Sequence, residues 1–477
     1  MFKRFYGIYA LAFLILGLFA SNCTQRAEGV DASIIIPEGE KDPAVWGKKY
    51  PNHYDSYLKN SERTKGYSRY RNDNEDRLSP WPFQFILFEG WGMGVEYNEP
   101  NGHTDMLKDQ LLIDAARRKA GGVCLTCKSP YAPILREKMG VDYFRKPYEE
   151  VHAQIPKEHQ KQGVSCADCH DPKTMDLRLS RWTIKEALKA IGKDPDRLTR
   201  QELRSLVCAQ CHVTYSIPKD KEGKSVYVKF PWANGKWGNI SIEGVIKQIK
   251  DENLREWKHK LTDQKIGHIR HPEFELFSSP GSVHWAAGVA CADCHMPYER
   301  VGSEKMSSHR WESPLKKNMK ACMQCHNQSS EWLKEQVFNI QDRVNHMFTK
   351  AGYALASAAL MIEAAEKNPK VDKGQLKKAK GLYEEAYYRN TWIGAENSMG
   401  FHNPPEALRV LGDALDQGRQ AEIFAREIIL KAGAMPPELD IARIDKIVSE
   451  RYLSKDNKTG FKKNVPKKAR LLTEVIR

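Results

Sequence analysis

The sequence predicts a mainly α fold, and three observations support this prediction. Residues 328–390 lack cysteine and carry apolar side chains at helical spacing, at Val337, Ile340, Val344, Met347 and Phe348. The stretch Ala354–Ala365 is apolar and helix-favouring, and Glu406–Lys431 repeats the helical pattern. Alternating strand-like runs are scarce, and Ser225–Phe230 is one weak strand candidate.

The amino-acid composition excludes several classes of protein. Hydrophobic residues make up 41% and charged residues 29% of the 477 residues. These values exclude a disordered chain, a collagen-like repeat and a polytopic membrane protein. The 11 cysteines are too few for a disulfide-dense scaffold, and all except Cys23 fall into five C-x-x-C pairs.

The first 23 residues have the pattern of a secretory signal peptide. Lys3 and Arg4 precede an uncharged, mostly apolar run at 5–20, which is shorter than the roughly 20 residues of a transmembrane helix. The run ends in Ala-Ser-Asn-Cys23, similar to a lipoprotein processing box. Lipid attachment at Cys23, cleavage without lipid and a retained anchor all stay open. We expect the mature protein in the periplasm or on the outer face of the cytoplasmic membrane.

Three regions follow the signal peptide. Residues 24–80 are polar and are expected to form an irregular arm on the body. Residues 81–327 hold all five cysteine pairs but no long amphipathic stretch, so something other than a large apolar core must stabilise them. Residues 328–477 form the predicted C-terminal helical region.

Four of the cysteine pairs are followed directly by histidine. They are Cys166-Ala-Asp-Cys169-His170, Cys208-Ala-Gln-Cys211-His212, Cys291-Ala-Asp-Cys294-His295 and Cys322-Met-Gln-Cys325-His326. C-x-x-C-H is the attachment pattern of c-type haem, in which the thiols form thioethers and the histidine reaches the iron. Zinc is the competing ligand, but four copies in one exported chain favour haem. Each macrocycle would also supply the missing apolar core.

The fifth pair, Cys124-Leu-Thr-Cys127-Lys128, ends in lysine. A disulfide, a redox dithiol and a degenerate haem site are the alternatives to a lysine-ligated haem. A lysine ligand binds iron as the neutral amine, and burial lowers the pKa of a lysine in the direction that this requires.

C-x-x-C-K followed by four C-x-x-C-H motifs resembles the pentahaem ammonia-forming cytochrome c nitrite reductases. The resemblance covers residues 80–410 and includes segments 97–103, 205–213, 271–273 and 288–298. It implies a multihaem cytochrome c fold, five covalently bound haem c groups and six-electron reduction of nitrite to ammonium.

The resemblance also implies a second axial histidine for each C-x-x-C-H haem. His309 is expected to serve the second haem of the chain, His103 the third, His402 the fourth and His284 the fifth. Iron bound by two histidines has no open position, so these haems would carry electrons. Four other histidines have no such match and are expected to be structural: His152, His159, His259 and His346.

Only the Lys128 haem is left with an open face for substrate. The resemblance implies that His271 donates protons there and that Tyr215 hydrogen-bonds to reduced intermediates. It also implies an arginine, for which Arg117 is the first choice and Arg118 the second. The alternative for both arginines is a solvated basic helix end.

Many members of this family bind calcium beside the active haem, through a Glu, a Gln and two carbonyls. Here the Glu position is Thr214 and the Gln position is Arg270, while the carbonyls belong to Tyr215 and His268. A protein-bound calcium ion is usually coordinated by six to eight oxygen ligands. We therefore expect no calcium, with the Arg270 guanidinium in its place donating to those carbonyls. The alternative is that Arg270 points to solvent and calcium binds nearby.

The net charge of +14 does not indicate nucleic-acid binding in an exported haem protein. Haem propionates would offset most of it, and the remainder would attract nitrite. The expected electron donor is a membrane quinol-oxidising multihaem cytochrome or a soluble cytochrome. A non-catalytic electron conduit and a multihaem hydroxylamine oxidase are the competing functions.

A homodimer through the helices of 328–390 is implied by the resemblance. The apolar residues of this stretch are equally consistent with packing inside one chain: Ala354, Leu355, Leu360 and Met361.

Overall fold

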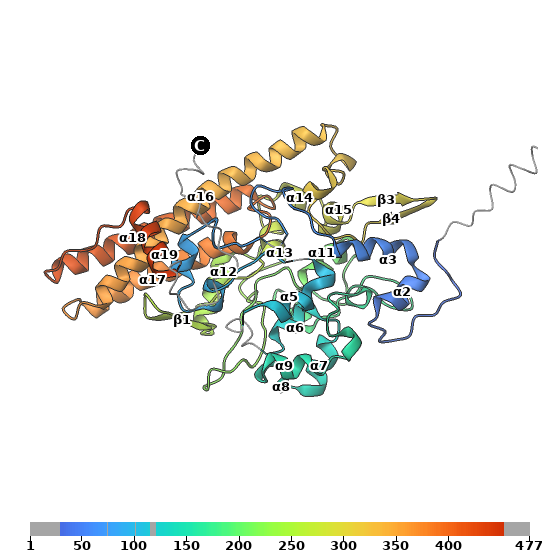
Figure 1. Ribbon diagram of the computed structural model, residues 1–477, viewed down its shortest axis with the longest axis horizontal. Helices are drawn as coiled ribbons and strands as arrows, with labels where there is room; N and C mark the ends of the chain where they lie inside the picture. Colours follow the sequence, from blue (N-terminus) through green and yellow to red (C-terminus); the bar gives the residue numbers. More distant parts are fainter. Residues whose placement is uncertain (1–28, 74, 101, 115–120, 453–477) are drawn as a thin grey trace, which may run out of the picture.

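The structure is a computed structural model that describes residues 29–73, 75–100, 102–114 and 121–452. Over these ranges the chain is mainly helical, as predicted, and the strands form two small antiparallel hairpins. The long C-terminal helices lie at one end of the molecule, and the short helices that carry the cysteines lie beside them (Figure 1).

The chain before residue 330, which includes the arm and the five cysteine pairs, consists of short elements. Its helices are α2 (Pro43–Lys49), α3 (Pro51–Leu58), α4 (Phe83–Leu87), α5 (Met106–Leu112), α6 (Val123–Lys128), α7 (Ala132–Met139), α8 (Asp142–Arg145), α9 (Tyr148–His152), α10 (Trp182–Ala190), α11 (Arg200–Ala209), α12 (Ile242–Asp251), α13 (Glu273–Phe277), α14 (Val283–Ala286) and α15 (Cys291–His295). Its strands are β1 (Trp257–His259) with β2 (Gln264–Ile266), and β3 (Tyr298–Val301) with β4 (Glu304–Ser307).

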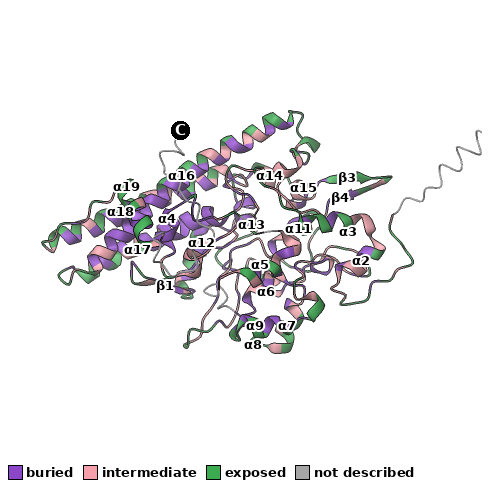
Figure 2. Cartoon of the chain, in the orientation of Figure 1, coloured by how far each residue is buried: buried purple, intermediate pink, exposed green. Residues whose placement is uncertain are grey.

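The C-terminal region has the four longest regular elements among the described residues: α16 (Ser330–Glu366), α17 (Lys373–Ala395), α18 (Pro404–Lys431) and α19 (Ile441–Tyr452). Ser329, Asp372 and Asn403 cap the first three, because each side chain accepts a hydrogen bond from a first-turn amide. Helix α18 packs along both α16 and α17. The buried residues are concentrated in these helices (Figure 2).

The packing of α16 decides one of the alternatives left by the sequence. Ala354, Leu355, Leu360 and Met361 are all buried within this one chain. At Gly352 a methyl group would lie 2.3 Å from the Phe83 ring, so this glycine lets α4 approach α16 closely. These apolar residues therefore pack internally, and a homodimer stays a prediction that needs another surface.

Two local predictions were wrong. Ser225–Phe230 is not a strand but makes only isolated bridges, Ser216 to Lys229 and Lys219 to Ser225. The arm of residues 24–80 is not irregular throughout, because it contains α2 and α3. Helix α2 begins after Asp42, whose carboxylate accepts from the Ala44 amide at 2.8 Å, and its Trp46 packs beside Cys166.

Within residues 29–452, gaps excepted, no helix has the length and apolarity needed to span a bilayer. The predicted signal peptide at residues 1–23, with Cys23, lies outside the described residues.

Candidate active site

Each C-x-x-C pair lies on one helical turn, which explains the spacing. The pairs lie on α6, at the end of α11, on α15 and on the 3₁₀ turns Cys166–Asp168 and Cys322–Gln324. Residues three apart on a helix lie on the same face. The amide of His212 donates to the Cys208 carbonyl at 2.9 Å, and His170 and His326 do the same one turn after their first cysteine. Both sulfurs and the following side chain can therefore face one macrocycle.

The motifs are adjacent in space although they are far apart in the sequence. Cys211 Sγ lies 3.3 Å from the Cys127 carbonyl, so the third motif contacts the first. The side chains of Cys208 and Cys291 are within hydrogen-bonding reach, so the third motif also contacts the fourth. Groups attached at these three motifs would be close enough to exchange electrons directly.

The eight candidate axial histidines form four pairs, matched as the sequence predicted. Ring centroids are 6.1 Å apart for His170 and His309, 5.9 Å for His212 and His103, 6.3 Å for His295 and His402, and 6.3 Å for His326 and His284. A metal–imidazole bond is about 2.0–2.1 Å long, which places two opposed ring centroids about 6 Å apart. The spacing therefore fits one metal ion between the rings of each pair.

Four of these eight rings have a polar neighbour at Nδ1. His170 Nδ1 lies 2.8 Å from the Met175 carbonyl, His295 Nδ1 3.0 Å from the Glu312 carbonyl and His309 Nδ1 2.9 Å from the Ser307 carbonyl. His402 Nδ1 lies 2.6 Å from Oε1 of the buried Glu396. Partners at Nδ1 leave Nε2 for the metal, as is usual for metal-binding histidines.

Burial favours the neutral imidazole in five of the eight rings. In His212 and His402 the carboxylates of Glu273 and Glu396 outweigh burial and raise the pKa. Burial is the main cause that lowers the pKa of His103 and of His309 to about 3, and the pKa of His295 to about 4. Neutral imidazole is the form that binds metal. Among the described residues, no three His, Cys, Asp or Glu side chains converge as a metal-ion site. Opposed histidine pairs next to the C-x-x-C turns fit haem.

The first motif along the chain, Cys124-Leu-Thr-Cys127-Lys128, differs in its surroundings. Lys128 ends α6, and its Nζ donates to Oε1 of the buried Gln110. Cys124 and Tyr215 pack against the same apolar cluster, so the predicted catalytic tyrosine lies beside this motif. Burial raises the pKa of the Tyr215 hydroxyl above its ordinary value, which keeps the hydroxyl protonated at neutral pH.

His271 is held in an unusual backbone conformation. Its φ of 48° lies in the left-handed region, which is costly for a residue other than glycine, by about 1–3 kcal/mol. Its Nδ1 lies 3.8 Å from Oε1 of Glu273, while Oε2 of the same carboxylate lies 3.8 Å from Nδ1 of His212. Glu273 therefore stands between the predicted catalytic histidine and the third motif, and both rings direct Nε2 away from it.

Arg270 is buried and directed into the space predicted for it. Its Nη1 donates to the Tyr215 carbonyl at 3.1 Å and to the His268 carbonyl at 3.4 Å. Its amide donates to Thr214 Oγ1 at 3.3 Å. The guanidinium also lies 4.8 Å from the centroid of the Tyr215 ring, within range of a cation–π contact.

The sequence did not indicate the carboxylate partner of Arg270. The Glu256 carboxylate accepts hydrogen bonds from Arg270 Nη1 at 3.0 Å and from Arg270 Nη2 at 2.6 Å, and the Glu256 side chain is only 4% exposed. Burial alone would lower the pKa of Arg270, but the Glu256 charge raises it above the ordinary value. No motif marks Glu256, which lies fourteen positions before Arg270 and next to β1.

A second missed residue is Glu275. Its Oε1 accepts from the Thr214 amide at 2.9 Å and from Trp232 Nε1 at 2.8 Å, and the residue is fully buried. Burial raises the pKa of Glu275 to about 8, so this carboxyl is neutral at pH 7. Arg117 and Arg118 lie outside the described residues.

Residues 42–476 match the family Cytochrome c552. The chain belongs to the cytochrome c552 family. It is 32% identical over 468 residues to "Cytochrome c-552" of Bacteroides fragilis, covering 95% of this chain and 91% of that protein. It is 31% identical over 476 residues to "Cytochrome c nitrite reductase subunit NrfA" of Nitratidesulfovibrio vulgaris, covering 90% and 87%.

The fold matches a solved nitrite reductase. The catalytic subunit NrfA from Desulfovibrio desulfuricans superimposes with a TM-score of 0.75 at 29% identity, covering 86% of this chain and 91% of that one. That catalytic subunit has two calcium sites. These findings confirm the predicted multihaem cytochrome c fold of the nitrite reductase type. As a member of this family, the chain is an oxidoreductase that binds c-type haem covalently.

Proposed function

We propose that this protein reduces nitrite to ammonium, using six electrons and eight protons, at a haem that Lys128 and its two neighbouring cysteines would hold. Four further haems, each held by one of the histidine pairs, would store and deliver the electrons. The observation that carries the proposal is the difference between the motifs. In four motifs the histidine ring faces a second histidine ring, with the ring centroids about 6 Å apart. The Lys128 motif instead lies beside Tyr215.

When bound, the haem supplies an iron atom that takes nitrite and passes electrons to it. The residues of the chain would supply protons and orientation. His271 would donate protons to the substrate, and the Glu273 carboxylate, 3.8 Å from its Nδ1, would help to orient the ring. Tyr215 would donate a hydrogen bond to the substrate, because its pKa is raised. Arg117, or otherwise Arg118, would add the positive charge that attracts the anion.

Arg270 would take the role of calcium in this chain. The Desulfovibrio desulfuricans subunit has two calcium sites, whereas here a guanidinium donates to the carbonyls of Tyr215 and His268. Glu256 completes the pair, so the charge at this position is balanced without a metal ion. We propose that catalysis is independent of calcium.

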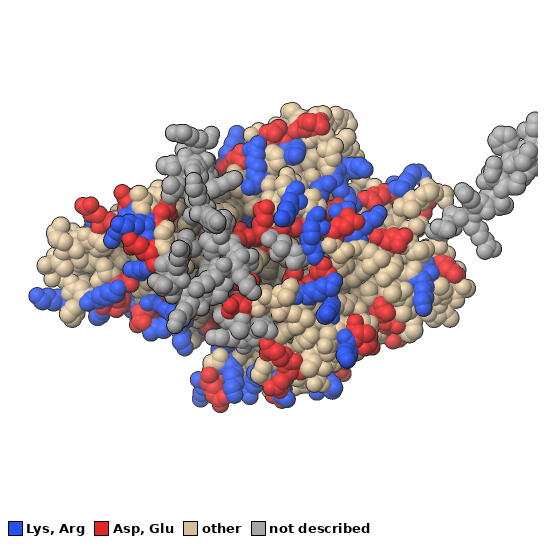
Figure 3. Space-filling view, viewed as in Figure 1, with Lys and Arg blue, Asp and Glu red and all other residues tan. Residues whose placement is uncertain are grey.

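The electron donor would be a membrane quinol-oxidising multihaem cytochrome or a soluble cytochrome, and the protein would act outside the cytoplasm as a homodimer. On the face in Figure 3, cationic and anionic side chains are interspersed, so no single-sign surface identifies the donor's docking position. A non-catalytic conduit is the alternative function.

Nitrite consumption with reduced viologen separates the two functions. The wild-type protein should consume nitrite, and Lys128→Ala should lose most of this activity while both cysteines keep the haem attached. Full activity of Lys128→Ala, with an unchanged high-spin spectrum, would show that Lys128 is not the ligand. No activity in the fully haem-loaded wild-type protein would favour the conduit.

A further inference from the structure

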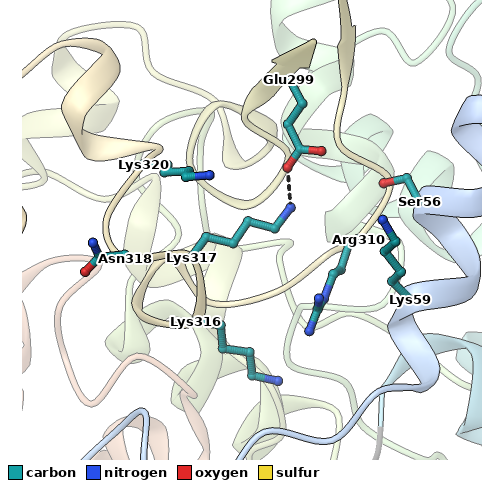
Figure 4. Close-up of a pocket in the computed structure, with 8 residues that line it drawn as sticks. All are labelled: Ser56, Lys59, Glu299, Arg310, Lys316, Lys317, Asn318 and Lys320. Atoms are coloured by element: carbon teal, nitrogen blue, oxygen red, sulfur yellow. Dashed lines mark hydrogen bonds and ion pairs between the residues drawn. The ribbon is translucent and has the colours of Figure 1, made fainter. Parts of the chain in front are cut away.

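A cavity of about 380 Å³ lies between α3, β3 and the segment of residues 310–320. Five of its eight lining residues are cationic and one is acidic, and all eight are drawn in Figure 4: Ser56, Lys59, Glu299, Arg310, Lys316, Lys317, Asn318 and Lys320. A nitrite ion is far smaller than this space. The lining therefore suits an anion with several oxygens, or more than one carboxylate.

Carboxylates of the protein itself pair with three of the five cations, Arg310, Lys316 and Lys317, and leave two. Lys317 Nζ lies 2.6 Å from Glu299 Oε1, and Lys316 Nζ lies 2.7 Å from Asp73 Oδ2. The side-chain ammonium groups of Lys59 and Lys320 make no hydrogen bond or ion pair with any residue that the structure describes. Concentrating like charges around one space is unfavourable unless an anion enters it.

The segment that presents the lysines is strained. Asn318 and Met319 are consecutive non-glycine residues in the left-handed region, with φ of 48° and 59°. Such conformations persist only where the surroundings hold them. Met319 is buried with Leu333 and Val337 at the base of α16, and this packing holds the turn so that three lysines face one cavity.

The wall of the cavity is connected to two candidate haem ligands. Ser56 lines the cavity, and its Oγ accepts from the His309 amide at 2.9 Å. The Glu312 carboxylate lies 2.8 Å from Arg310 Nε, and the backbone carbonyl of Glu312 lies 3.0 Å from His295 Nδ1. Ser56 and Glu312 thus link the wall of the cavity to His309 and His295, the candidate ligands of the second and fourth haems.

We propose that this cavity is a carboxylate-binding site whose occupants are propionates of the haems held by the second and fourth motifs. Lysine and arginine form short, charge-assisted hydrogen bonds with carboxylates. Their charge would also favour the reduced state of the nearby iron, which carries one positive charge fewer. The inference rests on the haem assignment of the proposed function but not on nitrite chemistry.

Redox titration of the haem-loaded protein without nitrite tests the site. Lys317→Gln should lower the midpoint potential of one low-spin haem by up to a tenfold change in its one-electron equilibrium, about 59 mV. The propionate modes of the resonance Raman spectrum should shift as well. Lys317→Arg should keep both signals. Lys380→Gln is the matched control, because Lys380 is 17% exposed and paired with Glu366, as Lys317 is 16% exposed and paired with Glu299.

Three results would overturn the proposal. The first is unchanged potentials and propionate modes in Lys317→Gln and in Lys320→Gln, an exposed lysine whose loss should not disturb folding. The second is an equal effect of Lys380→Gln. The third is a wild-type potential that depends on added succinate at constant ionic strength, which would assign the cavity to a soluble anion. Since none of these readouts uses nitrite, a failure here is distinct from a failure of nitrite reduction.

Discussion

Removing the charge of Arg270 should reduce both stability and turnover. In Arg270→Gln the buried Glu256 carboxylate loses both of its guanidinium hydrogen bonds, at 3.0 and 2.6 Å. The carbonyl of Tyr215 also loses its donor at 3.1 Å. The side chains of the pair are 8% and 4% exposed, so water cannot readily replace these bonds.

The magnitude follows from this burial. Breaking a buried ion pair by removing one partner costs about 3–5 kcal/mol, because an unpaired charge remains. In Arg270→Gln/Glu256→Gln both charges are gone, and at least half of this loss should be recovered. Arg255→Gln is the control, since Arg255 makes a similar two-bond pair with Glu384 but is 22% exposed. Arg255→Gln should lower the free energy of unfolding by about 1 kcal/mol.

Denaturant unfolding followed by tryptophan fluorescence measures the free energy of unfolding of the four proteins. Nitrite turnover should fall in Arg270→Gln, because the Tyr215 backbone is no longer fixed, and added calcium should not restore it. The account of Arg270 would be refuted by a loss below about 1 kcal/mol, by equal losses at Arg270 and Arg255, or by stoichiometric calcium bound beside Tyr215.

Further predictions concern single side chains. Lys128→His should retain its haem, because both cysteines remain, but should change the ligand field of the active iron and lower turnover. His402→Ala should convert one low-spin haem to high spin in the absorption spectrum; an unchanged low-spin count would remove this ligand assignment. His271→Gln should lower kcat more than KM changes, because the proton donor is lost and the cavity is kept; a change confined to KM would argue for binding alone. The Glu275→Gln protein should become more stable relative to wild type as the pH rises, by about 1.4 kcal/mol of unfolding free energy per pH unit. The difference should increase from pH 4.5, the ordinary pKa of glutamate, to about pH 8, because over this range Glu275 ionises in the unfolded wild type but stays protonated in the folded one. Above pH 8 the difference should stay constant. A difference that does not depend on pH would contradict the assignment.

Features encoded in short stretches of sequence were predictable. The C-x-x-C spacing defines one helical turn, and the helical pattern predicted for 406–431 is confirmed as α18. The predicted helical stretch 328–390 is also confirmed as helical, but it forms two helices, α16 and α17, with a break at 367–372 that was not predicted. The structure brings His103, His284, His309 and His402 each to the predicted partner ring. Their coordination of iron stays a prediction.

Features that depend on tertiary contacts were not predictable. The Glu256–Arg270 pair joins positions on either side of the hairpin β1–β2, and no local pattern connects them. Glu275 is an ordinary helix residue in the sequence, and its complete burial in the folded chain is the main cause that raises its pKa. The arm forms α2 because Trp46 packs beside the second motif, a contact that polar composition hides.

The central claim is six-electron reduction of nitrite to ammonium by the haem-loaded protein. The most direct test measures nitrite consumed, ammonium formed and reduced viologen oxidised in the same sealed reaction. The account predicts one ammonium and six one-electron viologen oxidations for each nitrite, with no nitric oxide or nitrous oxide. An ammonium-to-nitrite ratio far from one, or electron consumption well below six, would contradict it.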